Sequence, residues 1–138
     1  KDRTDGSNGG ARMSIEIQGI HHASILSTDL DRSRAFYGGV LGLQEIKKPS
    51  TFEFTVVWFQ IGDGHIHLIP ADEPDTESPR HFAMHVEDAK AARVHLKDHG
   101  FPVAETTPIP GADRFFTQDP DGNRLELIQF SEDYGVGR

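Results

Sequence analysis

The sequence contains no cysteine among its 138 residues. This absence excludes disulfide bonds, thiol nucleophiles and zinc sites ligated by cysteine. Long apolar runs are also absent, since none approaches the roughly 18 residues that a membrane-spanning helix requires. Both absences fit a cytoplasmic protein, because disulfides are rare in that reducing compartment.

Positive charge is scarce. Lysine and arginine together number 14, against 22 aspartate and glutamate residues, which gives a formal net charge of −8. A surface that binds nucleic acid or an anionic membrane needs a concentration of basic side chains. We therefore expect neither kind of partner.

The composition predicts one folded domain between two tails. With 36% apolar and 26% charged residues, the chain has the make-up of an ordinary globular protein. Residues 1–13 are rich in glycine and polar residues and show no periodicity. We interpret them as a disordered N-terminal tail, or as residues added before a native start at Met13. Residues 132–138 have the same character, so the predicted domain spans residues 14–131.

The two halves of this domain carry the same pattern. His22 and His67 stand 45 positions apart, and the same spacing recurs 59 positions later in His81 and Glu126. An Asp-Gly turn shortly precedes the second residue of each pair. Two copies of one unit, related by a pseudo-twofold axis, would bring these four positions together. Three imidazoles and one carboxylate form a ligand set for a divalent metal.

Each half is predicted to form a strand, a helix and three further strands. Thr28-Asp29 and Asp88 offer N-caps for the helices, and glycines follow both helices at their C-termini. An acidic, proline-rich connection, residues 70–79, separates a first module of about 14–70 from a second of about 80–131. The fold class is therefore α+β, with two βαβββ modules. In the first module we expect strands at 15–26, 44–47, 52–61 and 65–69 and a helix at 31–40; in the second, strands at 81–87, 101–105, 114–118 and 124–130 and a helix at 89–99.

Alternation along the strands predicts one apolar and one polar face. The apolar face, expected to pack beneath the helices, carries Ile66, Leu68, Phe82, Met84, Val86, Leu125 and Leu127. The polar face carries His22, Ser24, His65, His67, His81, Ala83, His85, Arg124 and Glu126. A polar face on four strands indicates the inside of open, curved sheets around a wet pocket, which is the default binding site for a small molecule.

Five residues are predicted to line this pocket: Ser24, His85, Arg114, Phe116 and Arg124. The two arginines are candidates to hold an anionic substrate, with simple surface solvation as the equal alternative. Phe116 would form part of the wall.

The other histidines suggest less. His21 is expected to point away from His22, because neighbouring side chains in a strand face opposite ways. His65 shares a face with His67 but stands beside a turn, so it is either in the pocket or merely exposed. His95 and His99 are expected at an exposed helix end, where a cation suits the helix dipole.

Several stretches together resemble the vicinal oxygen chelate superfamily, which includes glyoxalase I, bleomycin-resistance proteins, fosfomycin-resistance thiol transferases, methylmalonyl-CoA epimerase and extradiol dioxygenases. The resemblance covers about residues 15–130. It rests on HASI at 22–25, DLDRS at 29–33, Phe36-Tyr37, LGL at 41–43, HFAM at 81–84 and DPDGNRLELI at 119–128.

The resemblance implies that His22, His81 and Glu126 are metal ligands. At the fourth position, glyoxalase-like and epimerase-like members have Glu or Gln, whereas this chain has His67. That histidine could bind the metal, act as a base or contact the substrate. The resemblance implies one divalent metal per site, either zinc, nickel, manganese, cobalt or iron(II).

The implied activity is that of a metal-dependent lyase or isomerase of the glyoxalase I type. The metal would bind two neighbouring oxygens of a small substrate and stabilise an enediolate as a C–H proton leaves. Glu126 is the first candidate for the catalytic base and His67 the second. An extradiol-type Fe(II) dioxygenase and a metal-free protein that binds a small molecule such as an antibiotic, and so confers resistance, are the alternatives. A conjugating transferase is a third alternative, which the sequence supports less than the other two.

A homodimer is expected. Many members of the superfamily pair modules across subunits, and the edge strands of open sheets need to be covered or paired. The connection of residues 70–79 is long enough to leave open whether a site is assembled within one chain or across two.

Overall fold

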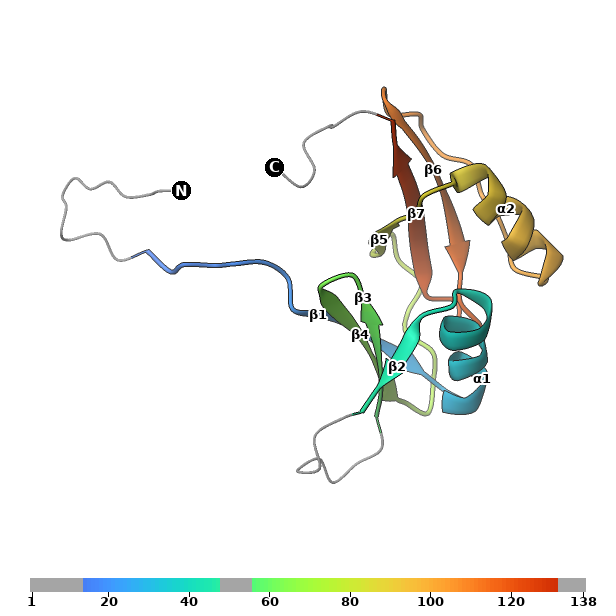
Figure 1. Ribbon diagram of the computed structural model, residues 1–138. Coiled ribbons are helices and arrows are strands. Elements are labelled where there is room, and N and C mark those ends of the chain that lie inside the picture. Colours follow the sequence, from blue (N-terminus) through green and yellow to red (C-terminus); the bar gives the residue numbers. More distant parts are fainter. Residues whose placement is uncertain (1–13, 48–55, 132–138) are drawn as a thin grey trace.

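The protein folds into two similar units, each with a small sheet and a helix (Figure 1). The computed structural model describes residues 14–47 and 56–131, so the predicted tails and the first part of the strand predicted at 52–61 lie outside the described residues. The first unit contains β1 (His22–Ser27), α1 (Leu30–Arg34), the π-helical η2 (Ala35–Val40), β2 (Gln44–Ile46), β3 (Val57–Ile61) and β4 (Gly64–Pro70). The second contains β5 (Phe82–His85), α2 (Ala89–Asp98), β6 (Ala112–Gln118) and β7 (Arg124–Phe130).

The two sheets share one topology. The first has the order β1-β4-β3-β2, with β1 parallel to β4 and the other neighbours antiparallel. The second has the order β5-β7-β6, with β5 parallel to β7 and β6 antiparallel to it. This repeat confirms the predicted α+β fold. It leaves β1 and β5 each at an edge of its sheet in the described part of the chain.

The strand predicted at 101–105 is wrong. That segment forms only an isolated bridge, in which Ala104 and Phe116 exchange two backbone hydrogen bonds of 2.9 Å. Pro102 has no N–H to donate, and proline within a strand removes a rung of the ladder. The second module therefore keeps one residue pair where the first has the whole of β2.

The strand predicted at 15–26 begins only at His22. Its partner in the sheet, β4, starts at Gly64, and His22 pairs with His65, so within residues 14–47 and 56–131 no strand pairs with residues 14–20. These residues form an arm that extends away from the body of the molecule (Figure 1). The arm exposes three isoleucines, Ile15, Ile17 and Ile20, at 81%, 81% and 88%.

Both helix starts are confirmed. The Asp29 carboxylate accepts from the backbone N–H of Arg32 at 3.1 Å, and the Asp88 carboxylate accepts from that of Ala91 at 3.0 Å. These bonds satisfy N–H groups that the first turn of a helix leaves without partners. Half of the first helix is π-helical rather than α-helical, which the apolar spacing did not indicate. Within the described residues, no helix is long and apolar enough to cross a membrane.

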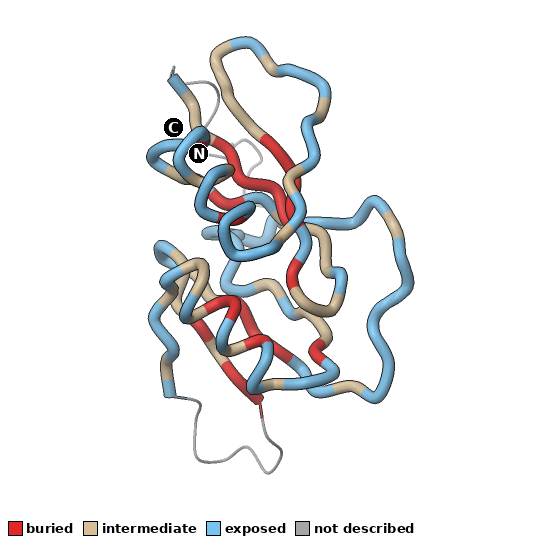
Figure 2. The backbone as a smooth tube through the Cα atoms, turned by 90° about the vertical axis from the view of Figure 1, so that its right-hand side faces the viewer, coloured by how far each residue is buried: buried red, intermediate tan, exposed pale blue. Residues whose placement is uncertain are grey.

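The apolar faces of both sheets and both helices meet in one core. As predicted, the residues on this face are buried or partly buried, with Leu68 and Leu125 at 0% exposure. Figure 2 shows the backbone coloured by burial. Full burial of a leucine stabilises the fold by about 1.5–3 kcal/mol. Val94 on α2 is 59% exposed. It lies two positions, about 200° around the helix, from the buried Leu96, so its side chain faces outward.

The two units are joined through the turn between β6 and β7. The Tyr37 hydroxyl donates to the Asp119 carboxylate at 2.7 Å, and both residues are buried. Burial, together with the Asp119 charge, raises the pKa of Tyr37, which therefore stays protonated. The Asn123 amide also donates to the backbone oxygen of Leu26 at 2.9 Å. These contacts fix one module against the other.

Candidate functional site

His22 and His67 lie side by side on the polar face of the first sheet. Their rings are stacked, with centroids 3.9 Å apart and planes 15° apart. Trp58 on β3 stacks on His67 from the neighbouring strand, at 4.0 Å and 5°. His67 is therefore held between β1 and β3 and is 7% exposed, whereas His22 is exposed.

The surroundings of His67 favour its neutral form. Burial, followed by the nearby His22, His65 and His21, lowers the pKa of His67 from 6.5 to about 4. A neutral imidazole keeps a lone pair on one nitrogen, which is the form that binds a metal or accepts a proton.

Two further histidines join this pair. The Nδ1 atoms of His21 and His22 lie 2.9 Å apart, and Nδ1 of His65 lies 3.3 Å from Nε2 of His67. The expectation that His21 points away from His22 is wrong, because β1 begins at His22 and strand alternation does not apply to the residue before it. Two adjacent histidines at a strand start were the available signal for this cluster.

The second pair belongs to the other module: Glu126 lies on β7, and His81 directly precedes β5. Nε2 of His81 is 3.0 Å from Oε1 of Glu126. Glu126 is 6% exposed at the middle of β7 and pairs with Phe116 on β6. The Phe116 ring meets the His81 ring edge-on at 4.8 Å, so Phe116 forms a wall beside the pair.

The ring of His81 is fixed at both nitrogens. Its Nδ1 lies 2.9 Å from the carbonyl oxygen of Pro79, which can only accept, so Nδ1 carries a proton. In neutral His81 the lone pair of Nε2 would then face a carboxylate oxygen of Glu126 at 3.0 Å. Two lone pairs repel at that distance unless a proton or a cation lies between them.

Arg114 and Arg124, the two arginines predicted to hold an anionic substrate, make different contacts. Nη1 of Arg114 donates to Oε2 of Glu126 at 3.0 Å, while its Nε and Nη2 donate to the carbonyl oxygen of Thr107 at 3.2 and 2.8 Å. Arg124 lies 3.9 Å above the centre of the Phe116 ring, a cation–π contact.

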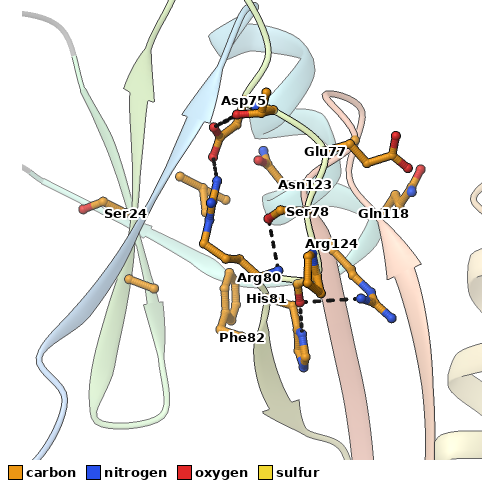
Figure 3. A pocket seen from close by; sticks show the side chains of 15 residues that line it. Ser24, Asp75, Glu77, Ser78, Arg80, His81, Phe82, Gln118, Asn123 and Arg124 are labelled. Carbon is orange, nitrogen blue, oxygen red and sulfur yellow. Dashed lines mark hydrogen bonds and ion pairs between the residues drawn. The ribbon is translucent and has the colours of Figure 1, made fainter. Parts of the chain in front are cut away.

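A cleft of about 710 Å³ opens beside His81 (Figure 3). Ser24 on the edge strand β1 forms one wall, and Arg124 and the connection from Asp75 to Arg80 form others. Of the five predicted pocket residues, Ser24 and Arg124 line this cleft, and Arg114 and Phe116 contact the His81–Glu126 pair. His85 lines a different, mainly apolar cavity of about 230 Å³ between α2 and the end of η2.

The structure brings the four predicted ligands together two by two. Among residues 14–47 and 56–131, no group of three or more His, Asp or Glu side chains is placed to hold a metal ion. The chemistry of each pair nevertheless fits a divalent ion. Two donors bound to one ion at about 2.0–2.2 Å each lie about 3 Å apart, which is the separation that His81 and Glu126 already have.

A family model of the Glyoxalase/Bleomycin resistance protein/Dioxygenase superfamily matches residues 19–127. The chain belongs to this superfamily. Glyoxylase I 4 of Arabidopsis thaliana is 28% identical over 125 residues, 82% of this chain and 71% of that protein. The lactoylglutathione lyase of Salmonella typhimurium is 28% identical over 138 residues, 84% of this chain and 95% of that protein. A crystal structure of a Bacillus anthracis protein assigned to the glyoxalase family has a TM-score of 0.78 and 30% identity, covering 86% of this chain and 99% of that one.

The fourth predicted ligand position of this chain holds His67, whose imidazole stacks between His22 and Trp58. Three of the four candidate ligands are therefore histidines.

Proposed function

We propose that the protein is a metal-dependent lyase or isomerase of the glyoxalase I type. It would bind two neighbouring oxygens of a small substrate and stabilise an enediolate. The observation that carries the proposal is the position of His81 between an acceptor-only carbonyl oxygen and the Glu126 carboxylate. A histidine that donates one ring N–H to a backbone carbonyl presents its other nitrogen in the tautomer that binds a metal.

The first sheet supplies the remaining donors. His22 and His67 stand next to one another, and His67 stays neutral above a pH of about 4. Together with His81 and Glu126 they give three nitrogens and one oxygen, a donor set for zinc, nickel, manganese, cobalt or iron(II). One ion per site is expected.

A homodimer would complete the site. Each chain offers its donors in two separate pairs, and each pair lies at an edge strand or its nearest neighbour. We infer that the His22–His67 pair of one chain meets the His81–Glu126 pair of a second copy. Such a contact would also cover the edges of β1 and β5, which are otherwise open to pairing.

The proposed chemistry uses one proton. When bound, the metal would supply positive charge next to two substrate oxygens and make the adjacent C–H more acidic. The Glu126 carboxylate would take that proton and return it to the neighbouring carbon. His67 is the second candidate base, because its ring is neutral at physiological pH. The substrate would enter through the cleft beside His81, where Ser24 and Arg124 form part of the lining (Figure 3).

Metal analysis and a substrate panel test the proposal. Untagged protein is loaded in turn with zinc, nickel, manganese, cobalt and iron(II), and bound metal is measured against His81→Ala. One ion per site in the wild type and loss in the variant are expected. The loaded protein is then assayed with hemithioacetals and α-hydroxycarbonyl compounds for proton transfer, and with catechols for oxygen consumption.

The outcomes separate the candidate functions. Oxygen uptake with catechols would favour the dioxygenase of the same superfamily. Failure to bind any of the five metals would overturn the proposal and favour a metal-free binding protein.

A further inference from the structure

Arg114 holds one oxygen of the Glu126 carboxylate and leaves the other facing His81. Its Nη1 donates to Oε2 at 3.0 Å, while Nε2 of His81 lies 3.0 Å from Oε1. The side chains of Arg114 and Glu126 are only 17% and 8% exposed, so this ion pair is largely shielded from solvent. The carboxylate is therefore bridged between two groups rather than free to rotate.

The guanidinium is itself anchored. Two of its N–H groups donate to the carbonyl oxygen of Thr107, at 3.2 and 2.8 Å, and its carbon lies 6.0 Å from the centre of the Phe116 ring. A planar guanidinium with its N–H groups fixed on both sides has little freedom to follow a moving partner. Arg114 is therefore placed to hold the orientation of Glu126.

We propose that Arg114 is a positioning residue, which fixes Glu126 through Oε2 so that Oε1 stays beside Nε2 of His81 as a single-oxygen donor. The proposal rests on the function proposed above, and it assigns Arg114 to the protein's own carboxylate rather than to an anionic substrate. Partners that orient metal ligands typically contribute 10–100-fold to metal affinity.

The first experiment measures metal affinity by competition with a chromogenic zinc chelator. Arg114→Met is expected to bind zinc roughly 10–100-fold more weakly than the wild type. Arg114→Lys keeps the charge but cannot contact Glu126 and the Thr107 carbonyl oxygen together. Its zinc affinity should therefore lie between those of Arg114→Met and the wild type. Arg34→Met is the control, since Arg34 forms ion pairs with Asp31 and Glu45 rather than with a candidate ligand, and its zinc affinity should be unchanged. Wild-type affinity in folded Arg114→Met would overturn the proposal.

The second experiment needs no metal and is therefore independent of the function proposed above. Protein with ¹⁵N-labelled histidine is examined by NMR in the presence of a chelator. In Arg114→Met the ring-nitrogen signals of His81 should shift, because Glu126 leaves Nε2, while those of His22 and His67 stay in place. If the wild type binds no metal, the proposed function fails and this measurement alone decides the role of Arg114; unshifted His81 signals would overturn it. Arg114→Gln replaces Arg114→Met in both experiments if the methionine variant does not fold.

Discussion

His67 lies flat against Trp58, with ring planes 5° apart and centroids 4.0 Å apart. The indole shields the imidazole from solvent on one side, and the His22 ring covers the other. This burial is the main reason that the pKa of His67 falls to about 4. The same stacking that places a nitrogen donor in the candidate site therefore keeps it unprotonated.

The stability of the metal-free protein should depend on pH through His67. The pKa of His67 is about 4 in the folded state and about 6.5 in the unfolded state. Between these two pH values the unfolded chain binds a proton at His67 and the folded chain does not. The stabilisation is present above pH 6.5 and is lost as the pH falls towards 4. Between pH 7 and pH 5 the loss should be about 2 kcal/mol. Urea denaturation at both pH values in the presence of a chelator measures it.

His67→Gln should remove most of this pH dependence. The exposed His99 serves as the control site, since His99→Gln should leave the dependence as in the wild type. An unchanged pH dependence in His67→Gln would contradict the environment described for His67.

Glu126→Gln should stop turnover while retaining more metal than His81→Ala. The amide preserves the shape and one oxygen of the carboxylate, but it cannot accept the substrate proton. A loss of about 10²–10⁴-fold in kcat is expected for a missing general base. Metal content and kcat are measured on the same preparations. A near-normal rate in Glu126→Gln would transfer the role of base to His67.

Complementation should show whether the site is shared. We expect His22→Ala and Glu126→Ala to be inactive alone. In a mixed dimer with shared sites, one site carries both lesions and the other neither, so about half of the activity returns. Light scattering first establishes the dimer, and a monomer at micromolar concentration would refute it. No recovery after confirmed subunit exchange would place both residues in one chain's site.

Tyr37→Phe should weaken the joint between the modules. The buried Asp119 carboxylate would lose the hydroxyl donor at 2.7 Å, which costs about 1–3 kcal/mol of unfolding free energy. Thr28→Val is a comparison in the same joint. Thr28 donates to Asp121, which keeps Arg32 and the backbone N–H of Thr28 as further donors, so this change should cost less. Urea denaturation measures both variants. Equal stability of Tyr37→Phe and the wild type would show that the hydroxyl bond contributes nothing.

The sequence predicted what depends on local pattern and on the repeat. Alternation placed Leu68 and Leu125 in the core, and the 59-residue repeat matches His22 at the start of β1 with His81 directly before β5. Prediction from the sequence failed where a strand depends on a partner that is distant along the chain. Residues 14–20 have the apolar content of a strand, but β4 begins too late along the chain to pair with them.

The side-chain contacts around the candidate site could not be predicted from the sequence. Nothing in the spacing of Arg114 indicates that it meets Glu126, because that contact depends on the register between β6 and β7. The stacking of Trp58 on His67 depends likewise on the register of β3 with β4. Such neighbours depend on the register of strand pairing. Alternation assigns a side chain to a face of the sheet, while its partner across the strands also depends on turn geometry.

The common core makes each half of the protein dependent on the other. Phe36 from the first half packs edge-on against Phe101 from the second, with centroids 4.6 Å apart, and His95 on α2 lies 2.8 Å from the backbone oxygen of Val40. A fragment cut within the connection at 70–79 would present this apolar face to water. The two halves should therefore melt in a single cooperative transition, and either one expressed alone should aggregate unless the other is supplied to it.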